Sequence, residues 1–192
     1  MNYVKEFEKK FSGKTFTTRD VKIFLENKGA NKNYYSLFIA NEIKKEKIFR
    51  LKNGVYSTNQ NLDESEKAFF PSYHGLQEAL TIHGFWGQET VPVIITPRKI
   101  RNGERKIFNS KILARRIGRK MFFGYETKKY HGAWITVSDP EKTLIDFAYY
   151  NEPIGKETLE EMKAIIDKKK LEKYLKQTNK RTKTKTEKLL VL

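Results

Sequence analysis

Cysteine is absent from the 192 residues of this chain, and histidine occurs only three times. The lack of cysteine excludes disulfide bonds, thiol nucleophiles and metal sites built from thiolates. No apolar run approaches the ~18 residues needed to span a membrane, and no signal-peptide pattern precedes the charged segment at residues 4–11. We therefore expect a soluble, cytoplasmic protein with no membrane contact, no metal site and no cofactor.

Positive charge, by contrast, is in clear excess. The chain has 39 Lys and Arg against 23 Asp and Glu, a formal net charge of +16. Such an excess favours a polyanionic partner, and nucleic acid is the leading candidate. With 38% hydrophobic and 13% aromatic residues, the chain can still build one large or two small hydrophobic cores.

Residues 15–57 show the element order of a winged helix-turn-helix, in which two short amphipathic helices are followed by a basic β-hairpin. A further helix over residues 4–11 precedes them. We expect Thr17 or Thr18 to cap the second helix, and Gly29 to end it.

The third helix is predicted over residues 31–45. Placing its residues at 100° intervals defines two sides, and we take the more apolar one as the side that faces the core. That side holds Tyr35, Ser36, Ile39, Ala40 and Ile43. The opposite side holds Asn33, Tyr34, Leu37, Asn41 and Lys44.

The second of these sides has the chemistry of a base-reading surface. Asn can pair with adenine in the major groove, an apolar side chain such as Leu37 can contact a thymine methyl, and lysines can bind phosphates. The alternative is that Tyr34 and Leu37 pack against Phe7 and Phe11 of the first helix.

Residues 48–57 alternate around Asn53-Gly54, a strong hairpin signal because both positions tolerate positive φ. As a wing, this hairpin would place Arg50 and Lys52 on the DNA backbone and add affinity that falls with salt. Alternatively, it is simply a solvated basic hairpin. The predicted DNA-binding residues are Arg19, Lys32, Asn33, Tyr34, Leu37, Asn41, Lys44, Lys45, Arg50, Lys52 and Asn53.

The polar residues that follow the hairpin have turn formers and no apolar periodicity, which predicts a linker. We divide the chain into a winged-helix domain (1–60), a linker (61–67), a mixed α/β domain (68–178) and a basic tail (179–192) expected to be frayed or disordered. The predicted fold class is therefore α+β: an N-terminal winged helix-turn-helix, a mixed α/β C-terminal domain and a C-terminal helix.

Several elements are expected in the second domain. They are a helix over 71–85 closed by Gly84, a strand over 91–97, a turn over 101–104, strands within 106–117, 119–126 and 134–138, a helix after 138 with a Ser138–Glu141 capping box, and a helix over 156–176 with Leu159, Met162, Ile165 and Ile166 inward.

Five segments occur in the order known from the AbiEi-type antitoxin family. They are FRLKNGVYS, SYHGLQEALTIHG, VPVIITP, FFGYE and VSDPEKTLIDFAYY. The chain thus resembles these transcriptional regulators, which are found beside nucleotidyltransferase toxins in type IV toxin-antitoxin and phage-defence operons. In the wing, Arg50 and Lys52 match the basic positions before Gly-Val-Tyr, whereas Asn53 stands where a basic residue is more usual.

The resemblance implies a sequence-specific DNA-binding regulator that is not an enzyme. Its partners would be double-stranded DNA, at the promoter of its own operon, and a nucleotidyltransferase toxin that it counteracts. A second basic surface is predicted in the α/β domain, where it could extend the DNA footprint, meet an acidic partner or merely face solvent. Its residues are Arg98, Lys99, Arg101, Arg105, Lys106, Arg115, Arg116, Arg119 and Lys120.

Two other functions are kept as alternatives. In the first, the protein is an interaction module that contacts a toxin or other partner, and its DNA binding is incidental. The second is a metal-dependent nuclease, because Glu104-Arg105-Lys106 resembles a Glu-x-Lys element, although no acidic partner stands in a convincing preceding strand. His74 and His83, nine positions apart on the helix expected there, would lie on opposite faces and could not share a metal.

Overall fold

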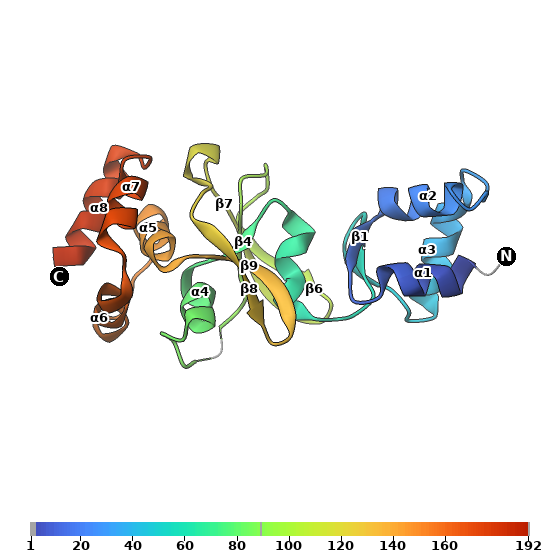
Figure 1. The fold of residues 1–192 in the computed structure, drawn as a ribbon, viewed down its shortest axis with the longest axis horizontal. Coiled ribbons are helices and arrows are strands. Elements are labelled where there is room, and N and C mark those ends of the chain that lie inside the picture. Colours follow the sequence, from blue (N-terminus) through green and yellow to red (C-terminus); the bar gives the residue numbers. More distant parts are fainter. Residues whose placement is uncertain (1–2, 89, 192) are drawn as a thin grey trace.

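The computed structural model describes residues 3–88 and 90–191 of the chain. Figure 1 shows an elongated molecule with the N-terminal helices at one end, a β-sheet in the middle and the C-terminal helices at the other end. Helices and two sheets alternate along the described chain, which confirms the mixed α+β class. None of the described helices is long and apolar enough to cross a membrane.

Residues 3–57, which we call the N-terminal unit, contain three helices and a small sheet. The elements are α1 (Tyr3–Phe11), β1 (Thr15–Thr17), α2 (Thr18–Glu26), α3 (Tyr34–Lys44), β2 (Phe49–Lys52) and β3 (Val55–Ser57). The expected helices and hairpin are present, and Thr17 caps α2 in a capping box with Asp20. Strand β1 was not expected. It is too short for a sequence pattern, and it forms because it pairs antiparallel with β3.

The core of this unit is built largely from phenylalanine. The ring of Phe7 lies 4.6–5.7 Å from those of Phe11, Phe16, Phe24 and Phe38, so that α1, β1, α2 and α3 all meet at one side chain. Such edge-to-face and tilted contacts add to the stabilisation from burial.

The linker prediction is wrong. Leu62–Phe69 form a 3-10 helix, η1, in which Glu64, Ser65 and Glu66 are buried although they are polar. Sequence periodicity does not reveal this segment because Glu64 and Glu66 are polar, and their buried carboxylates are paired with Lys67 and His74, respectively.

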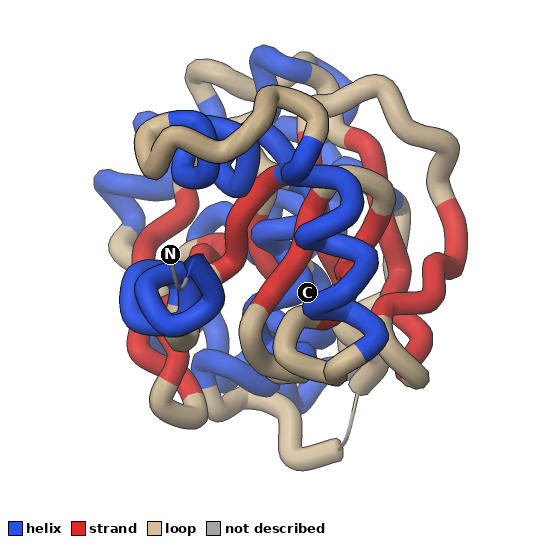
Figure 2. The backbone as a smooth tube through the Cα atoms, turned by 90° about the vertical axis from the view of Figure 1, so that its right-hand side faces the viewer, coloured by secondary structure: helices blue, strands red, loops and turns tan. Residues whose placement is uncertain are grey.

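Residues 62–191 form the C-terminal unit around a second sheet. After η1 come β4 (Tyr73–His74), α4 (Leu76–His83), β5 (Val93–Thr96), β6 (Gly103–Ile107), β7 (Ser110–Arg116), the 3-10 turn η2 (Arg119–Met121), β8 (Tyr125–Tyr130), β9 (Ala133–Ser138), α5 (Pro140–Tyr150), α6 (Lys156–Ile165), α7 (Lys168–Leu175) and α8 (Lys180–Val191). The strand order is β6-β7-β5-β4-β9-β8, with β5 parallel to β7 and β4 parallel to β9. Figure 2 views the molecule from the end of the N-terminal unit, so that the N-terminal helices lie in front of the large sheet.

The two faces of the large sheet are covered differently. Val93 and Ile95 of β5 pack in one core with helices α4 to α7. Ile94, which points the other way, packs in a second core with Phe69 of η1 and Leu51 of β2. The hairpin of the N-terminal unit therefore helps to cover the sheet of the C-terminal unit.

Several element boundaries differ from the expectation. Residues 73–74 are strand β4 and not the start of the helix, so His74 and His83 do not share a helix as assumed. Asp139, and not Ser138, caps α5, because its carboxylate accepts from the Lys142 N–H at 2.8 Å. The segment after Gly118 begins with η2 rather than a strand.

The C-terminal predictions also need correction. The expected single helix is interrupted between α6 and α7, so Ile166 is buried while Ile165 is 52% exposed. The basic tail, expected to be frayed, forms α8 and packs on α5 with Thr182 and Thr186 buried. Hydrophobic periodicity does not predict this buried face, because the two threonines that form it, four positions apart, are not apolar.

A buried charged group links η1, β4 and α4. Both His74 and Glu66 are almost fully buried, with His74 Nε2 3.1 Å from Glu66 Oε2 and His74 Nδ1 2.7 Å from Glu78 Oε2. Burial lowers the pKa of His74, but the carboxylates of Glu78 and Glu66 outweigh it and raise the pKa to about 10. The imidazolium form is therefore favoured in the folded protein.

This shift predicts a pH-dependent stability. Because the folded pKa lies above the unfolded value of 6.5, the stabilisation is complete below pH 6.5 and is lost as the pH rises through 10. The free energy of unfolding should fall by up to about 1.4 kcal/mol per pH unit between pH 7 and 9.5. For His74→Gln, the free energy of unfolding measured with urea should fall less steeply with pH than for the wild type. An equal pH dependence in the two proteins would contradict this account.

The docking of α8 predicts a position-dependent effect of one substitution. Thr186→Lys should lower the free energy of unfolding by on the order of 2 kcal/mol, because it places a long cation in a fully buried position. Thr184→Lys makes the same change at an exposed position of the same helix, and should alter stability by less than ~0.5 kcal/mol. Equal effects in thermal unfolding would indicate that α8 does not dock.

Candidate nucleic-acid interface

The exposed side of α3 carries a continuous row of predicted DNA-binding residues. Asn33, Leu37, Asn41 and Lys44 follow one another at spacings of four and three, so they line one face of the helix. All four are exposed, and the exposed fraction of Leu37 is 56%. Ser36 and Ala40, expected to face the core, are exposed beside this row.

Tyr34 does not belong to that row. Its ring is half-buried, 6.1 Å from the rings of Tyr3 and Phe38. Phe38 and Glu42 are buried, although neither was assigned to the core side. The core side of α3 is thus rotated from the expected one, because the phenylalanine cluster around Phe7 captures Phe38.

The remaining basic residues predicted to bind DNA in the N-terminal unit differ in how accessible their charges are to a phosphate. Arg19, Lys32 and Lys44 are exposed. The Nζ atom of Lys45 lies 3.0 Å from Glu42 Oε1, so its charge is partly neutralised.

The hairpin is packed against the rest of the N-terminal unit and against the C-terminal unit. The carbonyl of Gly54, whose φ is +78°, accepts from the Thr18 N–H at 3.0 Å, which ties the turn to the start of α2. Leu51 is buried in the core shared with the C-terminal unit. Arg50 and Asn53 are exposed, as the prediction requires.

Lys52 is the exception among the hairpin residues. It is half-buried, and its Nζ lies 5.2 Å from the ring centre of Phe69. Burial lowers the pKa of Lys52, and the nearby charge of Arg98 lowers it further. Lys52 thus faces the C-terminal unit, where it meets one member of the second basic surface.

The nine residues predicted as a second basic surface divide into two groups. Six lie at the end of β5 and β7 or in the segments that follow these strands, and all six are exposed: Arg98, Lys99, Arg101, Arg116, Arg119 and Lys120. The other three lie elsewhere in β6 and β7. Arg105 donates to carbonyls of its own loop, Arg115 pairs with Glu152 at 2.5 Å, and Lys106 is exposed on β6.

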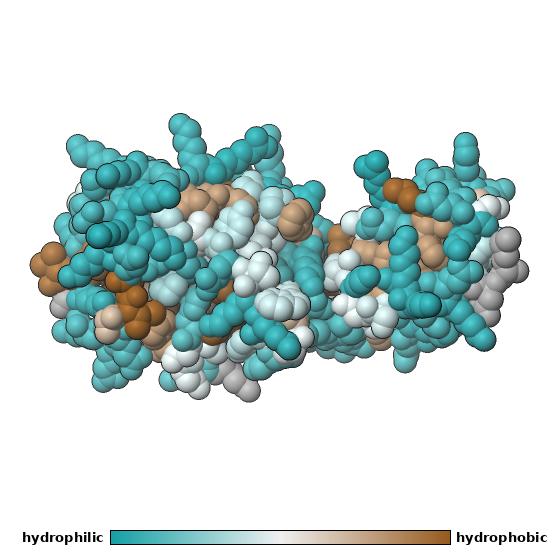
Figure 3. Space-filling model, in the orientation of Figure 1, coloured by the Kyte–Doolittle hydropathy of each residue, from teal (hydrophilic) through white to brown (hydrophobic). Residues whose placement is uncertain are grey.

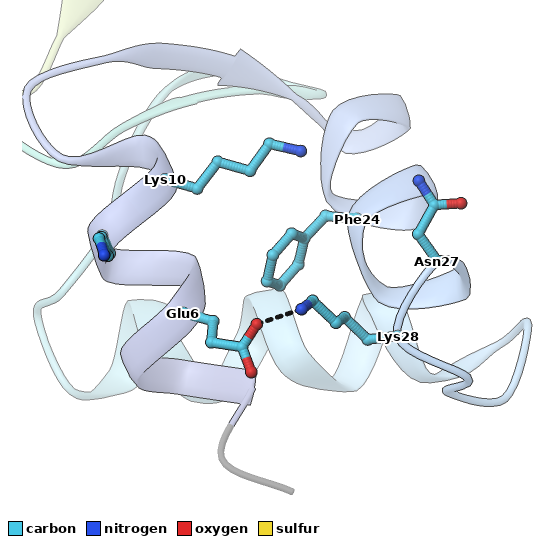
Figure 4. Close-up of a pocket in the computed structure, with 6 residues that line it drawn as sticks. Glu6, Lys10, Phe24, Asn27 and Lys28 are labelled. Atoms are coloured by element: carbon cyan, nitrogen blue, oxygen red, sulfur yellow. Dashed lines mark ion pairs between the residues drawn. The ribbon is translucent and has the colours of Figure 1, made fainter.

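The surface of the N-terminal unit is also hollowed elsewhere. An open hollow of about 510 Å³ lies between α1 and the end of α2. Figure 4 shows Glu6 and Lys10 on one side, Phe24 and Lys28 on the other, and the ion pair between Glu6 and Lys28. Because its lining holds no residue predicted to bind DNA, we do not assign it to the interface. Figure 3 shows a mainly hydrophilic surface with an indentation between the two units.

The groups considered for catalysis lie apart. Glu104 Oε2 is 3.1 Å from Lys111 Nζ on the exposed β6–β7 hairpin. His83 Nε2 lies 2.7 Å from the carbonyl of Ser138, and burial lowers the pKa of His83. Within residues 3–88 and 90–191, His, Asp and Glu side chains form no group of three that could hold a metal ion.

The different environments of Tyr34 and Leu37 predict that truncation of Tyr34 lowers stability much more than truncation of Leu37. Tyr34→Ala should lower the free energy of unfolding by ~1–3 kcal/mol, because it removes a ring packed against Phe38. Leu37→Ala should change it by less than ~0.5 kcal/mol, since the side chain is mostly exposed. Chemical denaturation measures both values, and Tyr34→Phe should retain most of the wild-type stability. A larger cost for Leu37→Ala than for Tyr34→Ala would show that the orientation of α3 is wrong.

Sequence comparison leaves the family of the chain open. No protein-family model matches it, and no match was found among curated proteins. Among solved structures, the fold is similar to that of the Rv2827c protein from Mycobacterium tuberculosis, with a TM-score of 0.65 and 11% sequence identity. The similarity covers 99% of this chain and 75% of that protein. At such low identity the likeness concerns the fold alone.

Proposed function

We propose that this protein is a sequence-specific DNA-binding regulator of the winged-helix type, with α3 as the helix that enters the major groove. The observation that carries the proposal is the exposed row on α3, in which Leu37 lies between two asparagines. Amides and an apolar group at helical spacing are suited to base edges and thymine methyls, respectively.

The charge around this row supports the same proposal. Lys44 continues the row, Lys32 precedes the helix, and Arg50 is exposed on the hairpin that follows it. Backbone phosphates on either side of a major groove would be bound by such flanking cations, which fix the orientation of the helix on the duplex.

The biological role follows from the sequence resemblance. An AbiEi-type antitoxin would occupy the promoter of its own operon and counteract a nucleotidyltransferase toxin encoded beside it. The hairpin departs from a free wing, since Lys52 faces the C-terminal unit. We therefore assign the backbone contact of the hairpin to Arg50 and not to Lys52.

The proposal predicts that paired substitutions on α3 abolish discrimination between DNA sequences. Leu37→Ala/Asn41→Ala should reduce the affinity for the upstream region of its own gene by at least about 30-fold, because two base contacts worth about 1–3 kcal/mol each are lost. Binding to an unrelated duplex of equal length should change little. Fluorescence anisotropy at fixed salt measures both affinities.

A matched control is available on α2. Ile23 is 44% exposed and Asn27, four positions later, is exposed as well, so Ile23→Ala/Asn27→Ala makes the same chemical change on the neighbouring helix. This control should bind both duplexes as the wild type does. The proposal fails if the α3 and α2 variants behave alike, or if the wild type does not distinguish the two duplexes.

A further inference from the structure

One edge of the large sheet gathers chain segments that are distant in sequence. Strands β5 and β7 are parallel, with Thr96 opposite Arg116, so the segments that follow them leave the sheet at the same edge. Strand β4 runs antiparallel to β5, which brings Phe70 and Pro71 to this edge too. Ligands of α/β sheets commonly bind outside the carboxyl ends of strands.

A hollow of about 330 Å³ lies at this edge. It is lined by Pro71, Pro97, Arg98, Arg119 and Phe122. Its walls are apolar, and its polar groups are the two guanidinium groups. In the part of the chain that the structure describes, neither arginine pairs with a carboxylate, whereas Arg115 of the same sheet does.

Hydrogen bonds hold the segments around the hollow in place. Thr96 Oγ1 donates to the carbonyls of Phe69 and Pro71 at 3.0 and 2.8 Å, and accepts from the Arg98 N–H at 3.2 Å. Arg98 Nη1 donates to the Phe70 carbonyl at 2.8 Å, which uses one of the five N–H donors of its guanidinium. A ligand would therefore meet a largely ordered site and would lose little free energy in ordering it.

The hairpin of the N-terminal unit contributes a third cation near this edge. Lys52 lies over Phe69, close enough to Arg98 for the two charges to repel. Two cations thus line the apolar hollow, and a third lies near one of them. Such an arrangement is suited to an anion, because the anion would offset their mutual repulsion.

We propose that this hollow is a phosphate-binding site, in which Arg98 and Arg119 hold the phosphate group and the prolines and Phe122 contact the ester group attached to it. Guanidinium groups bind phosphate oxygens through paired N–H donors. These donors are available because neither arginine pairs with a carboxylate in the described part of the chain. The phosphate can belong to a nucleotide or to a nucleic-acid backbone. The site itself is independent of base reading by α3.

Calorimetric titration of the full chain with 5′-AMP tests the nucleotide as the source. Wild-type protein should bind AMP at least tenfold more tightly than adenosine, which lacks the phosphate. Arg98→Ala/Arg119→Ala should lose at least tenfold in AMP affinity, whereas Lys176→Ala/Arg181→Ala should not. This control removes the same charge from exposed positions in the C-terminal helices. Arg98→Lys, which keeps the charge, should bind at an intermediate level and guards against misfolding of the double variant.

Titration with a duplex of ~30 base pairs tests the backbone as the source. In that case Arg98→Ala/Arg119→Ala should weaken binding at least tenfold and lower the slope of log affinity against log salt by about one to two. The proposal is overturned if the double variant matches the control for both AMP and duplex. Leu37→Ala/Asn41→Ala should leave AMP binding unchanged, so that failure of the α3 proposal and failure of this one give different results.

Discussion

The insertion of Leu51 into the core of the C-terminal unit is the contact on which the arrangement of this protein depends. The hairpin that carries Leu51 pairs with β1 inside the N-terminal unit, while its side chain packs with Ile94 and Phe69 beneath the large sheet. The hairpin therefore contributes to two hydrophobic cores, because Tyr56 of β3 packs in the core of the N-terminal unit. Because apolar burial in both cores requires the same hairpin position, the exposed side of α3 is held at a fixed orientation to the basic edge of the sheet.

The packing of the C-terminal unit has a cost in free energy, because it buries polar groups. Lys142 and Asp146 are completely buried and form an ion pair, and Tyr73 Oη donates to Asp146 at 2.9 Å. His74 is enclosed with Glu66 in a similar way. A buried ion is tolerated only with a partner, so each of these groups constrains which elements can lie side by side. They join η1, β4 and α5 into one unit.

The packing pairs some lysines and arginines with carboxylates and leaves others exposed to solvent. Arg115, Lys142 and Lys170 are paired with carboxylates. The lysines and arginines of the α3 side and of the edge formed by β5 and β7 remain exposed. The net charge of +16 thus describes the whole chain, whereas the availability of each cation for a ligand depends on its neighbours.

The sequence by itself determined the elements whose signals are local. The helices of the N-terminal unit, the Asn53-Gly54 turn and the buried strand β5 follow from periodicity, capping and turn chemistry, which act within a few residues. The tertiary structure alone decided which side of α3 is buried, that Lys52 faces Arg98, and that the polar segments η1 and α8 are ordered. Those outcomes depend on contacts between residues far apart in the chain, and such contacts leave no local pattern to read.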